Sequence, residues 1–427
     1  MEILNTKNLS VEKILSRIKR VQSKKQDVET SVKNILMSVK TGRDKAVFKL
    51  TEKFDEVKLT SLKVDVREIT DAYSQVSPAL LRALKRAKRN IVKFHKANLI
   101  KKGPVVETEK GVKSWREFRP IEKVGLYVPG GKAAYPSTVL MLAVPAKIAG
   151  CEKVIICTPV DKFGKCNPAV LVAADICGVS NVYKIGGAQA IAAMAYGTET
   201  VPRVYKIFGP GNQYVTTAKM LVYGEVDIDM PAGPSEVLII ADKDANPRWI
   251  AADALSQLEH GEDSQSILIT FSEDFARKVI EEMKSQIREL SRKNIIAESF
   301  GKSFAIIVDS EEQACEITNE YAPEHLEIIT KNPRKTLKKI NNAGSVFLGE
   351  YSSEPLGDYA SGANHTLPTS GYAKMFNPLS AESFGKMMQV QKISKAGIKR
   401  LKKTVEIIAE SEGLTAHKKA ITIRDYD

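Results

Sequence analysis

The sequence predicts an α/β protein with two lobes, each built on a doubly wound parallel sheet, with a helical N-terminal layer and a small helical C-terminal tail. Two observations lead to this fold class. Short β-branched runs that end in Gly or Pro alternate with helical stretches, and this alternation occurs in two successive series. Apolar residues at helical spacing dominate before the first series and after the second.

The N-terminal layer is predicted from residues 8 to 98. Its apolar side chains recur at helical spacing, as at Val11, Ile14 and Ile18, and again between Val32 and Val39. We expect these helices to form a covering layer.

The first α/β series begins at Val124. Its strands are predicted in VGLYVPGG, VIICTPV, VYKIGG and YKIFGPGN, and its helices over residues 137–149, 168–177, 188–196 and 213–223. Strands and helices that alternate at this pace form parallel sheets, so each series predicts an incomplete Rossmann-like lobe. The second series has strands in EVLIIAD, SILITFS, AIIVDS and SVFLG, with helices near 247–259, 274–290, 311–320 and 333–341.

After Phe376 and Pro378 the strand pattern ends. The segment from about Ser394 onward is rich in lysine and has helical spacing. We therefore expect a helical tail.

Composition excludes several classes of protein. The five cysteines are odd in number and contain no C-x-x-C pair, which argues against a disulfide framework and a thiolate zinc site. No apolar stretch suits a membrane span, and the first residues lack a signal-peptide core. We expect a cytoplasmic protein with no membrane contact.

The formal net charge of +13 keeps nucleic-acid binding as an alternative. The basic residues are spread along helices, as in RIKRVQSKK and RALKRAKR, without interleaved aromatic clusters. Solvated helix faces explain this distribution better, so we expect no nucleic-acid partner.

Four of the five histidines lie among carboxylates, amides and glycines. Histidine is the commonest nitrogen ligand of divalent metals and the usual proton carrier near neutral pH. The exception is His95 in KFHKANL, which we expect on a helix surface in a structural role. The other four, which predict a site, are His260, His325, His365 and His417.

Four segments carry these histidines with possible partners. In SQLEHGEDSQ, Gln257 and His260 share a helix face and could reach one ion, although a helix C-terminus with a favourable His explains the segment equally well. In YAPEHLEI, we expect Glu324 and His325 where a loop enters a strand, and the pair could divide water activation and proton transfer. A helix that starts at Pro323 and Glu324 with a half-exposed His is the alternative, and this segment taken alone favours it. The other two stretches are a loop with Asp358 and His365, and a tail segment with Glu412 and His417 that a surface helix would also explain.

Glycine turns lie at predicted strand ends, where doubly wound sheets bind ligands. They occur in VPGGKAAYP, KIGGAQA, FGPGNQ and PAGPSE. None has the G-x-G-x-x-G dinucleotide fingerprint, because GPGNQY places Tyr214 at the third glycine. The residues alone therefore indicate a ligand crevice and leave its ligand open.

Eight segments, in register from about Val124 to Arg424, resemble the successive motifs of the histidinol dehydrogenase family. They are VGLYVPGG, GGAQAIAAMAYGT, GPGNQYVTTAK, DMPAGPSEVL, LSQLEHGEDSQ, APEHLEI, GDYASGANHTLPT and SEGLTAHKKAITIR. The resemblance implies two successive NAD-dependent oxidations of L-histidinol through L-histidinaldehyde to L-histidine. The chain departs from the family pattern mainly over residues 376–394.

The resemblance also assigns residues. It places the catalytic pair on Glu324 and His325 and implies one zinc ion per subunit, with manganese or cobalt as substitutes. NAD contacts fall on Tyr127, Gln189 and Asn212. Zinc ligands fall on Gln257, His260, Asp358 and His417. The substrate site comprises these four residues together with Ser235, His325, His365 and Glu412.

Family members are homodimers that exchange their C-terminal tails, so the resemblance implies shared active sites. We predict a helical segment over 1–23, a first lobe over 24–127 and 237–375 with the catalytic loops, a second lobe over 128–236 on the NAD side, and an exchanged tail over 376–427.

A thiol mechanism, as in aldehyde dehydrogenases, is the enzymatic alternative. It needs an exposed cysteine at a strand end, and only Cys166 lies in an obvious loop. A basic nucleic-acid-binding protein with a structural metal is the other alternative, but it gives no role to Glu324 and His325. The sequence does not choose among metals, or between NAD and NADP.

Overall fold

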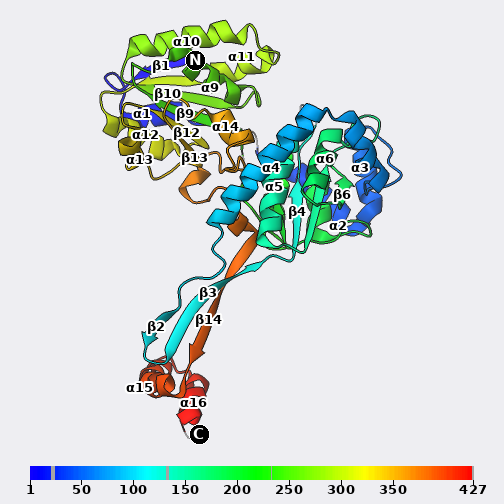
Figure 1. The fold of residues 1–427 in the computed structure, drawn as a ribbon, viewed down its shortest axis with the longest axis vertical. Coiled ribbons are helices and arrows are strands. Elements are labelled where there is room, and N and C mark those ends of the chain that lie inside the picture. Colours follow the sequence, from blue (N-terminus) through cyan, green and yellow to red (C-terminus); the bar gives the residue numbers. More distant parts are fainter. Residues whose placement is uncertain (21–24, 131–133, 232, 426–427) are drawn as a thin grey trace.

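The computed structural model describes residues 1–427 except 21–24, 131–133, 232 and 426–427. Figure 1 shows two α/β lobes and a long arm that projects from them and ends in short helices. A six-stranded sheet forms the core of one lobe and a five-stranded sheet that of the other, and both are parallel throughout. The predicted fold class is confirmed. No helix in the described parts of the chain is long and apolar enough to cross a membrane.

The six-stranded sheet defines lobe A, with the strand order β1-β11-β10-β9-β12-β13. Its strands are β1 (Glu2–Asn5), β9 (Glu236–Ala241), β10 (Gln265–Thr270), β11 (Phe304–Ile307), β12 (His325–Ile329) and β13 (Ser345–Leu348). The helices of lobe A are α1 (Val11–Arg17), α9 (Pro247–Leu258), α10 (Glu273–Ile287), α11 (Lys293–Gly301), α12 (Glu311–Tyr321), α13 (Pro333–Leu337) and α14 (Glu354–Tyr359). Alternate residues of β9 face opposite sides of the sheet, so Val237 packs with α9–α11 and Leu238 packs with α1 and α12.

The five-stranded sheet defines lobe B, with the strand order β6-β5-β4-β7-β8. The chain moves outward from β4 to β6 and then returns to the other side of β4, so β4 and β7 flank the topological switch point. Its strands are β4 (Lys123–Tyr127), β5 (Lys153–Thr158), β6 (Val182–Lys184), β7 (Lys206–Phe208) and β8 (Asp227–Ile228), and its helices are α5 (Pro136–Ala149), α6 (Pro168–Ile176), α7 (Gly187–Tyr196) and α8 (Gln213–Val222).

The helical N-terminal layer packs on lobe B. It comprises α2 (Lys25–Asp55), α3 (Val66–Ala72) and α4 (Pro78–Asn98). Helix α2 packs against α7 and α8, whereas α3 and α4 join the cluster of α5 and α6. This packing differs from the predicted grouping of residues 24–127 with 237–375, because the apolar faces of these helices are complementary to lobe B. The predicted boundary between residues 23 and 24 lies outside the described residues.

The N-terminal segment also contains a strand that we did not predict. Strand β1 pairs in parallel with β11 at the edge of the lobe A sheet, from Glu2 opposite Phe304 to Asn5 opposite Ile307. Only four residues form it, too few for a periodic pattern. The segment predicted as helical over 1–23 is therefore a strand followed by α1.

The arm is an antiparallel sheet with helices at its far end. Our expectation that strands end at Phe376 is wrong, because β14 (Gly385–Ile393) pairs with β3 (Val112–Pro120) along its whole length. Most of its residues are exposed on both faces, so GKMMQVQKI lacks the alternation that indicates a strand. The arm is completed by β2 (Val106–Glu109), α15 (Lys395–Ser411) and α16 (Thr415–Thr422).

The described residues also form short 3-10 turns at Tyr73–Gln75, Tyr372–Lys374, Ala381–Phe384 and Ile423–Asp425.

Candidate active site

The candidate site lies between the two lobes. Lobe A contributes residues at the amino ends of β9 and β12, and lobe B contributes the start of α5, which follows the carboxyl end of β4. The side chain of His365 bridges them: its Nδ1 lies 3.0 Å from the carbonyl oxygen of Asp358, and its Nε2 lies 3.2 Å from Oγ1 of Thr138 in α5. Next to it, Asn364 donates to the carbonyl oxygen of Met141. The loop after α14 therefore connects the site to lobe B.

The predicted catalytic pair stands at the entrance to β12. Helix α12 ends where Ala322 adopts a left-handed conformation (φ 50°), and Pro323 prevents the helix from continuing. The chain then turns directly into the strand, with Glu324 before it and His325 as its first residue. Both side chains are buried, at 7% and 2% exposure.

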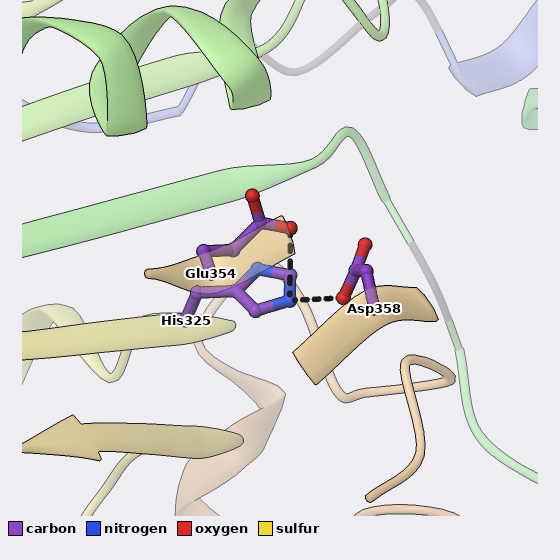
Figure 2. Close-up of side chains that lie close together, drawn as sticks. All are labelled: His325, Glu354 and Asp358. Atoms are coloured by element: carbon purple, nitrogen blue, oxygen red, sulfur yellow. Dashed lines mark hydrogen bonds and ion pairs between the residues drawn. The ribbon is translucent and has the colours of Figure 1, made fainter. Parts of the chain in front are cut away.

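Two carboxylates of α14 face Nε2 of His325, as Figure 2 shows. Oδ1 of Asp358 lies 3.2 Å from Nε2, and Oε1 of Glu354 lies 3.9 Å from it. Ligand atoms of these three residues all lie within 4.8 Å of one another, close enough to hold a metal ion. We did not predict Glu354, although it precedes Asp358 by four residues and so shares one face of a helix with it.

Three other groups surround Nδ1 of His325. The amide nitrogen of Gln257 lies 2.9 Å away, the carbonyl oxygen of Glu236 3.1 Å, and Oε2 of Glu324 3.7 Å. The amide N–H can donate only to an unprotonated Nδ1, whereas the carbonyl and carboxylate oxygens need a proton on it. Nδ1 of His325 thus has partners in both protonation states, which suits a group that accepts and returns a proton.

Burial and charge shift the pKa values of this cluster. Burial raises the pKa of Glu324 to about 8, although the neighbouring His325 opposes the shift. Burial also lowers the pKa of His325, but Glu324, Asp358 and Glu354 outweigh it and raise that pKa to about 10. For Asp358, the hydrogen bond and charge of His325 outweigh burial and lower the pKa. Burial, together with the charge of Asp358, raises the pKa of Glu354 to about 8.

Three of the four predicted metal ligands are gathered around His325. Gln257 contacts it from α9, and Oε1 of the same amide is buried without a hydrogen-bond partner among the described residues. His260 follows α9; burial lowers its pKa, and the charges of Asp358 and His325 also act on it. An unpartnered buried oxygen beside a carboxylate and an imidazole fits an oxygen- and nitrogen-ligated cation.

The two predicted site residues of the tail, Glu412 and His417, do not lie near the candidate site within the same chain (Figure 1). Glu412 caps the end of α15 and His417 lies in α16, and both are exposed. Figure 1 places these helices at the far end of the arm. Ser235, predicted to bind substrate, lies directly before β9 and is half-buried.

The predicted NAD residues lie at the carboxyl edge of the lobe B sheet, around the switch point. Tyr127 ends β4 and its hydroxyl accepts the N–H of Gly187, while burial raises the pKa of Tyr127 to about 12. Gln189, in the first turn of α7, is 2% exposed. Asn212 is exposed and caps α8 by accepting the N–H groups of residues 214 and 215. The hydroxyl of Tyr127 thus holds the glycine turn before α7, and Asn212 holds the one before α8. Of the three predicted NAD residues, Asn212 is exposed to solvent, whereas Tyr127 and Gln189 are buried.

Two sequence-based expectations change in the structure. Cys166 lies in a loop but is 4% exposed, and burial raises the pKa of its thiol to about 12, so the thiol mechanism loses its candidate. His95 is 1% exposed on the inner face of α4, which corrects its predicted surface position. Its lysine neighbours lie on the exposed side of the same helix.

Comparisons with known proteins agree along almost the whole chain. The family model described as histidinol dehydrogenase matches residues 18–425. The histidinol dehydrogenase of Bacteroides fragilis (strain YCH46) is 51% identical over 408 residues, covering 95% of both chains. That of Clostridium acetobutylicum is 50% identical over 426 residues, covering 99% of both.

A solved structure extends this similarity to the fold. The crystal structure of histidinol dehydrogenase from Elizabethkingia anophelis superposes with a TM-score of 0.96 at 46% identity, covering 99% of this chain and 98% of the other. The chain therefore belongs to the histidinol dehydrogenase family.

Proposed function

We propose that this site oxidises L-histidinol to L-histidine with Glu324 and His325 as its proton-transfer groups. Histidinol dehydrogenases are oxidoreductases that catalyse the final step of histidine biosynthesis. The observation that carries the assignment of roles is the buried pair itself, a carboxyl whose pKa is raised to about 8 beside an imidazole held by three carboxylates.

We assign to His325 the role of accepting the hydroxyl proton of the substrate alcohol. Its neutral form takes this proton as hydride leaves the carbon, and the surrounding carboxylates then stabilise the imidazolium. The same carboxylates raise the pKa of His325 to about 10, and a divalent cation held by Asp358 would oppose that shift and so favour the neutral form. NAD, when bound near Tyr127, Gln189 and Asn212, would supply the hydride acceptor for each of the two oxidations. In the second, His325 takes the proton of the hydrated aldehyde in the same way.

We assign to Glu324 the role of general base that activates a water molecule between the two oxidations. Its raised pKa places its proton affinity near neutral pH, where a general base is most effective. The N–H of Glu236 donates to Oε2 of Glu324 at 2.9 Å and orients the carboxyl group. Water added to L-histidinaldehyde then forms the hydrate that the second oxidation converts to the carboxylate.

The metal ligands are assigned to Gln257, His260, Asp358 and His417 of the partner subunit. The unpartnered Oε1 of Gln257 supports this assignment, because a buried acceptor is otherwise costly. A bound divalent ion would supply positive charge and a template for the nitrogens of L-histidinol. Zinc, manganese and cobalt all suit this donor set.

The exchange of tails in a homodimer is part of the proposal. Within one chain, His417 and Glu412 lie at the end of an arm that projects away from both lobes. The helices there leave large apolar side chains exposed, namely Ile407, Ile408, Leu414 and Ile423. Such a surface suits burial against a second copy, and tail exchange is a low-cost route to a two-fold dimer.

The remaining assignments follow from the same arrangement. NAD is placed at the carboxyl edge of the lobe B sheet near Tyr127, Gln189 and Asn212, and Ser235 and His365 are assigned to the substrate. The five cysteines are free and buried, which is compatible with work in the cytoplasm.

A spectrophotometric assay with the purified zinc-loaded protein tests the activity. We expect L-histidinol to produce two NADH molecules per molecule consumed, with L-histidine as the product. Accumulation of L-histidinaldehyde with one NADH would contradict the second half of the proposal.

A further inference from the structure

We infer that Glu236 and Arg20 are positioning residues that hold Glu324 and His325 in register for the oxidation chemistry, an inference that rests on the roles proposed for that pair. The main chain of Glu236 contacts both residues. Its N–H donates to Oε2 of Glu324 at 2.9 Å, and its carbonyl oxygen lies 3.1 Å from Nδ1 of His325. Any displacement of residue 236 therefore moves the partners of both catalytic groups at once.

The side chain of Glu236 fixes that main-chain position. Its two carboxylate oxygens receive two bonds from Arg20, at 2.5 Å from Nε and 2.7 Å from a terminal nitrogen, and the N–H of Ser370 donates to it at 2.9 Å. The glutamate is 1% exposed. A two-pronged Arg–carboxylate pair is geometrically specific, and a carboxylate buried this deeply depends on its cation.

Arg20 also holds the other end of the catalytic turn. It donates to the carbonyl oxygen of Tyr321 at 2.8 Å, and its guanidinium lies 3.8 Å from the centroid of the Tyr321 ring. Tyr321 ends α12, three residues before Glu324, and its hydroxyl donates to Gln265 in β10. One cation thus joins the beginning of β9 to the turn that carries Glu324 and His325.

The same place is where the chain passes between the lobes. Arg20 lies between α1 of lobe A and α2 of lobe B, and Glu236 follows the crossing from β8 to β9. Two of the four non-glycine residues with positive φ in the described chain, Ala322 and Ser370, flank this cluster. Left-handed backbone at such residues persists where surrounding contacts hold it, so the cluster has the features of a constrained junction.

Variants of the two residues test the inference in the zinc-loaded enzyme. We expect Glu236→Gln and Arg20→Met to slow aldehyde oxidation by about 10²-fold, because small displacements of catalytic groups have effects of that size. The KM for NAD should stay unchanged, since NAD is assigned to lobe B. Arg20→Lys should recover part of the rate, because lysine keeps the charge and loses the second bond.

Arg17→Met is the matched control. Arg17 makes an Arg–Glu ion pair with Glu2 at 2.8 Å in the same lobe, with both partners about half exposed and away from the site. It should retain the wild-type rate. If Glu236→Gln does not fold, Arg20→Lys provides the same test on its own, with loss of rate at an unchanged KM for NAD as the expected result.

A double variant separates positioning from general destabilisation. If Glu236 acts through Glu324 and His325, then adding Glu236→Gln to Glu324→Gln should slow aldehyde oxidation by clearly less than the fold-change that Glu236→Gln causes in the wild type, because one of its two targets is already lost. Losses that multiply would overturn the inference. So would wild-type rates for Glu236→Gln and Arg20→Met while Glu324→Gln is impaired. If Glu324→Gln itself has no effect, the proposed function fails instead.

Discussion

The amide nitrogen of Gln257 lies 2.9 Å from Nδ1 of His325, while Oε1 of the same amide is buried without a hydrogen-bond partner among the described residues. One side chain therefore orients the proposed catalytic histidine and offers a free oxygen beside it. A metal ligand that also holds the reacting base links cation binding to the orientation of that base.

Replacement of Gln257 by Ala should weaken zinc binding by at least about 10-fold, since it removes an oxygen ligand and leaves the other donors in place. Equilibrium dialysis with metal analysis measures this directly. A variant that binds zinc as tightly as the wild type would show that Oε1 is not a ligand.

Removal of the metal should abolish turnover without unfolding the protein. The sheets of both lobes have hydrophobic clusters on both faces, and these involve large parts of the chain away from the site. Chelation followed by thermal unfolding should retain a cooperative transition, and zinc or manganese should restore activity. Loss of that transition would indicate a structural ion.

Replacement of Glu324 by Gln should leave oxidation of the alcohol nearly intact and slow oxidation of the aldehyde. Only the second half requires an activated water, and loss of a general base costs roughly 10²–10⁴ in rate. Single-turnover measurements with L-histidinol and with L-histidinaldehyde separate the halves. Equal impairment of both would argue against this division of roles.

Tail exchange predicts complementation between two inactive chains. A His417→Asn chain and a Gln257→Ala chain, combined as a heterodimer, should form one site with both lesions and one with neither. The heterodimer should recover up to about half of the wild-type activity per dimer. A verified heterodimer without activity would confine each site to a single subunit.

Acid should destabilise the fold through His95. Burial lowers its pKa from 6.5 to about 4, and Nε2 has no hydrogen-bond partner among the described residues. Because the folded pKa lies below the unfolded one, the unfolded chain binds the proton first. The stabilising contribution is complete above pH 6.5 and is lost as the pH falls toward 4.

The size of this effect follows from the shift, at most about 3 kcal/mol of unfolding free energy. Denaturant unfolding of wild type and His95→Gln between pH 4 and pH 7 measures it. The wild type should lose more stability than the variant over this range, and parallel curves would exclude His95 as the cause.

The sequence by itself determined the two parallel lobes and the local position of the catalytic pair. Buried strands such as β9 and β10 carry runs of apolar, mostly β-branched residues, VLIIA and ILI, so their pattern is visible without tertiary information. The position of Glu324 and His325 at a strand entrance followed from Pro323 and the apolar run after it. Both features are local, because they depend on neighbouring residues in the chain.

Tertiary structure decided the features that depend on distant partners. Strands β1 and β14 form because β11 and β3 complete their hydrogen bonds. Strand β1 is too short, and β14 too exposed, for its own residues to show a strand pattern. The membership of Glu354 in the site depends on where α14 lies relative to β12. His95 has lysines close to it in the sequence, but it lies on the buried face of helix α4 with Leu84, Ala87 and Ile91, which pack on lobe B. Sequence neighbours report local conformation, whereas burial and contact depend on the packing of elements that lie far apart in the chain.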